Sequence, residues 1–365
     1  MIGIAAADRI LSRSEPALSA LAQAQPLAEA EGLLAERAQI HYYRGNILFA
    51  QGNTAGCLAE HQAALAVAQE VDSPEWRARA LSGLGDAHYS SCRMRAALDA
   101  FQDCVALCDA HGYGRVALPN RAMIGHCMIY LQRVVDAVAI TQEARRMALR
   151  AGNPHAEMFA TQSLCVVLTQ SGQVDEAMRH IPGALEAARA LGARRYESNL
   201  LCLMAECGLS LGRRSESLQA ADNSVAISRE LGMGFDGPYA LAVLARATDD
   251  ATRRAALLAE GEAVLRKGSV GHNRVWYYRV AGDAQIETGS WLEADRCADE
   301  IRAVTSTEPL PLVEFIAARI KALSAVGRGE RGPELRDEID RLISHGKAKG
   351  HHSWLLSLAD ARKRF

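Results

Sequence analysis

Large aromatic side chains are scarce in this chain: Phe, Trp and Tyr together make up 5% of its 365 residues, although apolar residues reach 49%. Alanine accounts for much of the apolar share. It has the highest helix propensity and allows helices to approach one another closely. Runs of β-branched residues bounded by turn residues are also absent, so we expect no strands. This composition predicts an all-helical protein with closely packed helices.

Further absences argue against two classes of partner. The formal net charge is -2 and the isoelectric point is near 6.6, so the chain lacks the basic stripe of a nucleic-acid-binding protein. No stretch approaches the ~18 apolar residues of a membrane span. The N-terminal segment lacks the basic start and long apolar core of a signal peptide. We expect no nucleic-acid partner, no membrane partner and a cytoplasmic location.

The nine cysteines include no CxxC pair. Cys104 and Cys108 are one helical turn apart and near His111, so a metal site is one interpretation. The other is that Cys104 and Cys165 occupy positions where packed helices need a small side chain, and free cysteine behaves there as a small hydrophobe. We favour the second interpretation and expect reduced thiols in a reducing compartment, with no metal.

Two sets of glycines recur with a period of 40 residues. One set lies inside apolar helical stretches and comprises Gly45, Gly85 and Gly125. A fixed period of this size predicts stacked supersecondary units instead of one closed core. The second set follows such stretches, where a helix C-cap needs a left-handed backbone, and comprises Gly112, Gly152, Gly192 and Gly232.

Each unit has the same pattern: a first helix with a small residue in its middle, a tight turn, and a second helix with a small residue early. The segment YRGNILFAQGNTAGCLAEHQAAL shows all three parts, with Gly45, Gly52 and Cys57. Early second-helix alanines recur at Ala97, Ala137, Ala177 and Ala294. The turn residues are Gly52, Cys92, Gln132, Gly172, Gly212, Gly289 and Gly327.

This pattern resembles the tetratricopeptide repeat (TPR), in its longer 40-residue form, over about residues 33–348. The resemblance implies an all-α fold: a TPR-like right-handed α-solenoid, or superhelix, of seven to nine antiparallel helical hairpins. We expect N-terminal capping helices in residues 1–32, the repeat array in residues 33–348 and a C-terminal capping helix in residues 349–365.

Three segments carry loop residues that the repeat itself does not require. They are HGYGRVALPNRAMIGHCMIYL, LGMGFDGPYALAVLARATDDATRRAALLAEGEAVL and VGHNRVWYYRVAGDAQIETGSW. They resemble the C-terminal TPR region of bacterial adenylate/guanylate cyclases that also carry an AAA-type ATPase module. The catalytic and nucleotide-binding parts of those proteins are not in this chain. The resemblance therefore implies a regulatory or interaction region without cyclase activity.

Motifs that carry chemistry are missing. No GxxxxGK[ST] phosphate loop, HExxH zinc helix or GxSxG nucleophile elbow occurs. Residues 327–332 match GxGxxG, but a helix precedes them where a dinucleotide site needs a strand. We interpret them as an inter-helix turn and expect no catalytic, cofactor-binding or metal-binding residues.

The candidate site is the groove. In a TPR superhelix the first helices line the concave side, so their non-packing residues face a ligand, and aromatic and polar side chains suit peptide recognition. Trp276, Arg279 and Asp283 share one helix face, a spacing equally compatible with an internal ion pair stacked on an indole. The predicted groove residues are Tyr42, Asn46, Phe49, Asp86, Tyr89, His126, Tyr130, Gln162, Glu206, Arg246, Trp276, Arg279 and Asp283.

Three functions compete at this point. The first is a non-catalytic scaffold or regulatory region that binds a protein segment or a neighbouring domain in its groove, in bacterial cyclase/ATPase-type signalling. The second is a sensor whose small-molecule effector alters the curvature of the superhelix. The third, an enzyme with an unrecognised site, is the least supported by the motifs. Recovery of a stoichiometric protein partner distinguishes the first from the second.

Overall fold

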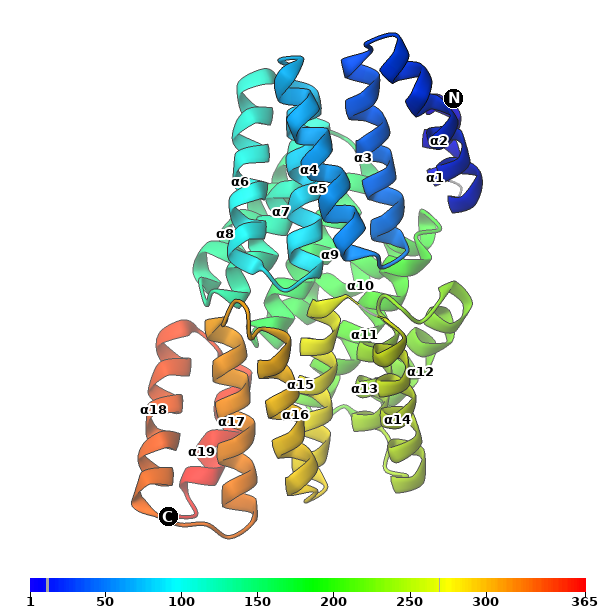
Figure 1. Cartoon of the computed structure of the whole chain (residues 1–365). Coiled ribbons are helices and arrows are strands. Elements are labelled where there is room, and N and C mark those ends of the chain that lie inside the picture. Colours follow the sequence, from blue (N-terminus) through cyan, green and yellow to red (C-terminus); the bar gives the residue numbers. More distant parts are fainter. Residues whose placement is uncertain (11–12, 269) are drawn as a thin grey trace. The chain divides into compact units, whose positions relative to one another are not determined.

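The computed structural model describes residues 1–10, 13–268 and 270–365, and within these ranges it contains nineteen α-helices and no strand (Figure 1). The prediction of an all-α protein is confirmed. The chain divides into two compact units, Met1–Ile124 and Gly125–Phe365, and helix α7 (Gly114–Tyr130) runs from the first into the second.

The first unit is built from consecutive helices joined by short turns, and each helix packs against the next along the chain. Residues 1–32, predicted to cap the array, contain two helices, and positions 11 and 12 lie outside the described residues. Before α7 the helices of this unit are α1 (Ile2–Ile10), α2 (Ser14–Ala30), α3 (Leu34–Ala50), α4 (Thr54–Glu70), α5 (Pro74–Ser90) and α6 (Met94–His111).

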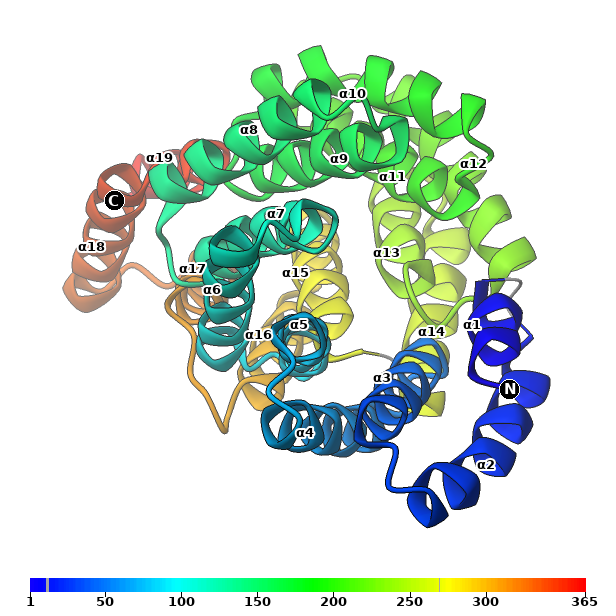
Figure 2. The same cartoon turned by 90° about the horizontal axis from the view of Figure 1, so that it is seen from above.

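The second unit continues the same arrangement. Figure 2 shows α9 and α11 on the inner side of its curved row of helices, and α10 and α12 on the outer side. First helices of hairpins therefore form the inner layer. The helices of this unit after α7 are α8 (Val134–Arg150), α9 (Pro154–Gln170), α10 (Val174–Ala190), α11 (Arg194–Ser210), α12 (Arg214–Leu231), α13 (Gly237–Ala247), α14 (Ala251–Lys267), α15 (Gly271–Glu287), α16 (Trp291–Val304), α17 (Pro311–Gly327), α18 (Pro333–Lys349) and α19 (His352–Arg362).

The in-helix glycines are explained by the side chain that lies on each of them from the following helix. A Cβ atom added to Gly85 would overlap the buried ring of Phe101, sixteen positions further on. One added to Gly125 would overlap the methyl group of Thr141 at the same offset. Glycine in a helix costs about 1 kcal/mol relative to alanine, so its recurrence reflects this close packing.

The turns between helices use left-handed backbone, as the second glycine series predicts. Gly112 has a φ of 77° and caps α6 in the left-handed conformation. Cys92 and Gln132 adopt φ values of 58° and 57° where other turns have glycine. One expectation was wrong: Gly327 is the last residue of α17, packed under the Trp291 ring, and Gly329 takes the positive φ of 94°.

The two ends of the second unit meet. His345 Nε2 on α18 lies 2.7 Å from Gln132 Oε1, in the turn before α8. Gly350, at the end of α18, lies against the side chain of Val134 at the start of α8. Helix α19 follows directly, so the last helix of the chain lies near the first helices of its own unit (Figure 2).

Enlarging an early second-helix alanine should destabilise the fold. Ala137 is 0% exposed and its carbonyl faces Gly125. We expect Ala137→Leu to reduce the free energy of unfolding by about 1–3 kcal/mol through overpacking. Thermal melting checks this, with Ala139→Leu as control because Ala139 is exposed on the same helix. Equal melting of the two variants would show that the packing assignment is wrong.

Candidate functional site

A cavity of about 510 Å³ lies within the second unit. Most of its lining comes from inner helices: Thr169 on α9, Glu206 on α11 and Arg246 on α13, followed by residues of α15, α17 and α19. The start of α10 adds Asp175. The cavity is thus built where the TPR resemblance predicts a ligand groove, from side chains of successive first helices.

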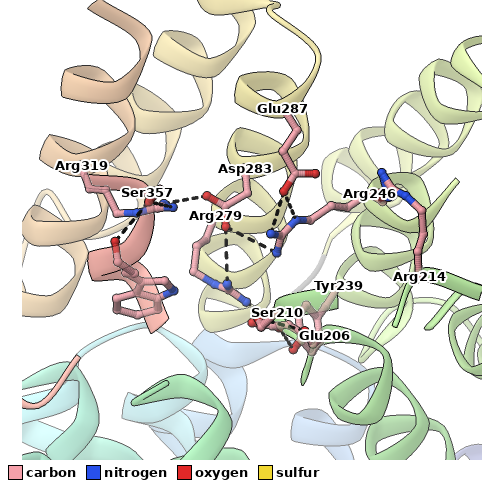
Figure 3. Close-up of polar contacts among 11 residues, drawn as sticks. Glu206, Ser210, Arg214, Tyr239, Arg246, Arg279, Asp283, Glu287, Arg319 and Ser357 are labelled. Carbon is pink, nitrogen blue, oxygen red and sulfur yellow. Dashed lines mark hydrogen bonds and ion pairs between the residues drawn. The ribbon is translucent and has the colours of Figure 1, made fainter. Parts of the chain in front are cut away.

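Asp283 on α15 is the centre of the buried polar wall, and its side chain is 5% exposed. Its carboxylate accepts a hydrogen bond from Arg319 Nη1 at 2.6 Å. The Nη1 atoms of Arg246 and Arg279 lie 3.8 and 3.9 Å from its other oxygen (Figure 3). Burial alone would raise the pKa of Asp283, but the three guanidinium groups outweigh it and hold that pKa below its ordinary value. Asp283 is therefore a carboxylate.

Arg279 is the most enclosed of these arginines, with a side chain 2% exposed. Its Nη2 donates to Glu206 Oε2 at 2.7 Å, and the Tyr239 hydroxyl donates to the same oxygen. The guanidinium lies over the Trp276 ring at 5.1 Å and over the Trp354 ring at 6.0 Å. Burial opposes the charge, but Glu206 raises the pKa of Arg279 above its ordinary value, so the group stays cationic.

The rim of the network is more open. Arg246 donates from both Nε (2.9 Å) and Nη2 (2.7 Å) to one oxygen of Glu287, whose side chain is 42% exposed. On the other side, Arg319 Nη2 donates to the Ser357 hydroxyl of α19 at 3.0 Å. The polar wall thus changes from buried ion pairs at Arg279 to a partly solvated pair at Arg246.

Six of the thirteen predicted groove residues belong to this network or lie directly behind it. Glu206, Arg246, Arg279 and Asp283 line the cavity. Trp276 (4% exposed) supports Arg279, and its ring lies 5.5 Å from that of the fully buried Tyr130. The spacing of Trp276, Arg279 and Asp283 was also compatible with an internal ion pair stacked on an indole, and that is the geometry found.

The other two predicted residues of the second unit are also buried. Gln162 Nε2 donates to Asn199 Oδ1 at 2.7 Å, and Asn199 Nδ2 donates to Asp236 Oδ1 at 3.3 Å, which connects α9, α11 and the residue before α13. His126 is 7% exposed, and burial lowers its pKa to about 4. Neither Gln162 nor His126 lines the cavity.

Five predicted residues fall in the first unit. Tyr42 packs edge-on against Trp76, with ring centroids 5.8 Å apart, and Tyr89 is 8% exposed. The remaining three, Asn46, Phe49 and Asp86, are half-buried. Their role in binding stays a prediction.

Sequence reasoning missed several members of the site: Tyr239, Glu287, Arg319, Trp354 and Ser357. The repeat itself contained a signal for two of them. Glu206 and Arg246 are 40 positions apart, and the polar series continues from Asp283 to Arg319 (36 positions) and from Arg319 to Ser357 (38 positions). Continuing the repeat spacing along the sequence beyond Asp283 would have identified both Arg319 and Ser357.

The described ranges contain no group of three or more His, Cys, Asp or Glu side chains placed to hold a metal ion. All nine cysteines are buried, and none of them forms a disulfide within the described ranges. None of the described helices is both long and apolar enough to cross a bilayer.

Comparison with known proteins supports a TPR-like solenoid. Residues 36–110, which span most of α3 to α6, match the tetratricopeptide repeat family. No curated protein matches the chain in sequence. Together with the helical architecture, these residues and the similar solved structures define the fold as an all-α TPR-like solenoid.

Three solved structures show the similarity of fold. A Rap protein complexed with competence and sporulation factor has a TM-score of 0.62 at 11% identity, covering 100% of both chains. The Rap conjugation gene regulator of plasmid pLS20, in complex with the Phr* peptide, has a TM-score of 0.63 at 12% identity over 78% of this chain and 80% of that one. NprR with its cognate peptide NprX has a TM-score of 0.58 at 13% identity over 92% and 98%.

Removing the central guanidinium should be costly. Arg279→Met leaves the buried carboxylates of Glu206 and Asp283 with fewer partners, so we expect it to lower the free energy of unfolding by about 3–5 kcal/mol. The control is Arg302→Met, since Arg302 pairs with Glu314 at 2.9 Å with both side chains more than a third exposed. Such a pair contributes about 0–1 kcal/mol. Similar urea midpoints for both variants would contradict a stabilising network.

His351 should make the stability of α19 depend on pH. It is 0% exposed and stacks on Phe315 and Trp354 at 5.5 and 5.2 Å. Burial, aided by the nearby His345, His352 and Lys349, lowers its pKa to about 4. Below the ordinary pKa of about 6.5, the unfolded chain binds a proton that the native chain does not. Stability is therefore lost as pH falls from about 6.5 towards 4.

His351→Phe removes this titration. Between pH 7 and pH 5, we expect this variant to lose roughly 1–2 kcal/mol less stability than the parent in urea denaturation. His352→Phe is the matched control, since His352 is exposed, and it should lose as much as the parent. Parallel curves for all three proteins would show that His351 is not held neutral.

Proposed function

We propose that this chain is a non-catalytic regulatory module that binds a segment of a protein or peptide in the cavity of its second unit. The observation that carries the proposal is that cavity's lining, where Arg246, Arg279, Asp283 and Trp354 converge from three different helices. Aromatic and arginine side chains in concave, desolvated positions provide most of the energy of peptide recognition.

The fold is compatible with such a role. Similar solved structures include a Rap protein complexed with competence and sporulation factor and NprR complexed with the peptide NprX. Binding of these two partners is a property of those proteins. At 11% and 13% identity the likeness extends to the fold, and we propose peptide or protein binding for this chain because its own cavity has suitable chemistry.

The signalling context rests on the sequence. The segments 111–131, 231–265 and 270–291 resemble the TPR region of bacterial cyclases with an ATPase module, and we propose that the chain regulates signalling of that type in the cytoplasm. In this role the chain itself turns over no nucleotide. Hydrolysis of ATP or GTP by the repurified chain above a buffer control would contradict the non-catalytic assignment.

A second candidate function, a small-molecule sensor, is favoured by the size of the cavity. A volume of about 510 Å³ lies within the range of about 300–1,000 Å³ typical of small-ligand sites. The two candidate functions predict different experimental results. A segment-binding module selects peptides from a random library, whereas a small-molecule sensor is stabilised by a metabolite and selects no peptide.

The test is selection of peptides from a random displayed library on the full chain, followed by affinity measurement with two serine variants. Ser210 is exposed and lines the cavity, so Ser210→Trp should fill it and weaken binding at least about tenfold, equivalent to about 1.4 kcal/mol. Ser215 is exposed on α12 outside the cavity, and Ser215→Trp should bind like the parent. Failure to select any peptide, or equal affinity for both variants, would contradict the proposal.

A further inference from the structure

The pair Arg246–Glu287 differs from the other ion pairs of the cavity in its exposure. The Arg279–Glu206 pair has side chains 2% and 8% exposed, and the Arg319–Asp283 pair 8% and 5%. In the rim pair, Arg246 is 16% and Glu287 42% exposed. A buried carboxylate cannot leave its arginine without losing its partners, whereas Glu287 can turn into water at small cost.

The hydrogen bonds of this pair are not the strongest that Arg246 can form with a carboxylate. Arg246 directs two donors, Nε and Nη2, at the single Oε1 atom of Glu287. A carboxylate that approaches the same edge from the cavity can give one oxygen to each donor, which is the stronger, two-pronged arrangement. Glu287 is the last residue of α15 and lines the cavity at the end of that helix, where its side chain contacts Arg246 (Figure 3).

Arg246 itself is held in place without Glu287. Its backbone carbonyl accepts a hydrogen bond from Arg214 Nη1 at 2.9 Å, and its Nη1 stays 3.8 Å from the buried Asp283. The donor edge that faces Glu287 would therefore remain directed at the cavity rim after Glu287 left. Asp283 keeps Arg246 charged and in position, and Glu287 occupies the edge that a ligand can take.

Unused donors deeper in the wall indicate that the ligand group is an acceptor. The Nε atoms of Arg279 and Arg319 are buried and have no hydrogen-bond partner among the described residues. Both arginines line the cavity. Its lining carries four carboxylates, with Asp175 the fourth, against three guanidinium groups. Long-range attraction of an anion is therefore weak, and recognition requires exchange at one defined pair.

We propose that Glu287 is a built-in stand-in for a carboxylate of the partner segment, which displaces it and binds Arg246 through both Nε and Nη2. The inference rests on the proposed function and specifies the partner: a segment with a carboxylate at its recognised position, supplied by an acidic side chain or by a chain terminus. Arg279 and Arg319 keep their buried partners during the exchange. Glu287 is a competitor, so its removal strengthens binding.

The experiment uses three pools of N-acetylated decapeptides with random uncharged residues, incubated with the immobilised full chain. One pool has Glu at the centre and an amidated end, the second has Gln there and an amidated end, and the third has Gln and a free C-terminal carboxylate. Retention is measured by mass spectrometry. On the parent we expect at least about fivefold greater retention of a carboxylate pool than of the amidated Gln pool. Whichever carboxylate pool is retained identifies the source.

Variants test the exchange in both directions. Glu287→Gln should raise retention of the carboxylate pool about threefold or more, and Arg246→Met should reduce it to that of the amidated Gln pool. Arg246→Lys keeps the charge without the two-pronged edge and should fall between the parent and Arg246→Met. The controls are Glu314→Gln and Arg302→Met, from an exposed Arg–Glu pair outside the cavity, and both should behave like the parent.

The outcomes separate the two proposals. If the parent retains all three pools equally, segment binding stands and the carboxylate inference is wrong. If Glu287→Gln leaves retention unchanged or lowers it, Glu287 is not a competitor and the inference is again wrong. If the parent retains no pool, the proposed function itself fails.

Discussion

One carboxylate, that of Asp283, holds together the helices that form the cavity. It receives guanidinium groups from Arg246 on α13, Arg279 on α15 and Arg319 on α17, so three successive first helices meet at a single charge. Charges of opposite sign alternate along this stack, beginning with Glu206 on α11. Because each repeat packs mainly on its neighbours, alternation lets every buried charge find a partner in its own or a nearby repeat. The wall is therefore rigid where it is buried and exchangeable at its rim.

The fold was predictable because the same helix–helix contact recurs in each repeat and requires the same kind of residue each time. A helix that carries a bulky residue such as Phe101 needs a gap in the preceding helix, and Gly85 is that gap. This local requirement recurs every 40 residues and is visible without any structure. The turns at Cys92 and Gln132 were also predictable from the period, although these residues adopt a left-handed backbone that glycine normally provides. The turn after α17 was not, because Gly329 has the positive φ there and Gly327 does not.

The site was predictable in part, for the same reason. Phase along the repeat identified Glu206, Arg246, Arg279 and Asp283, which line the cavity. It did not distinguish residues that face the cavity from aromatic residues that support it, such as Tyr130 behind Trp276. That distinction depends on how far the row of helices curves, and the residues that set the curvature are distant in sequence. The contact between Gln132 and His345, 213 positions apart, is an example that no local pattern contains.

The central claim, that a partner segment occupies the cavity of the second unit, is tested most directly by photo-crosslinking. A benzophenone-bearing amino acid is placed at Leu356, which is 69% exposed and lines the cavity, and in a second protein at Leu292, which is 78% exposed and does not. Each protein is irradiated with a peptide selected on the full chain. The account predicts a covalent adduct from position 356 and none from position 292. Equal yields from both positions, or an adduct from position 292 alone, would contradict it.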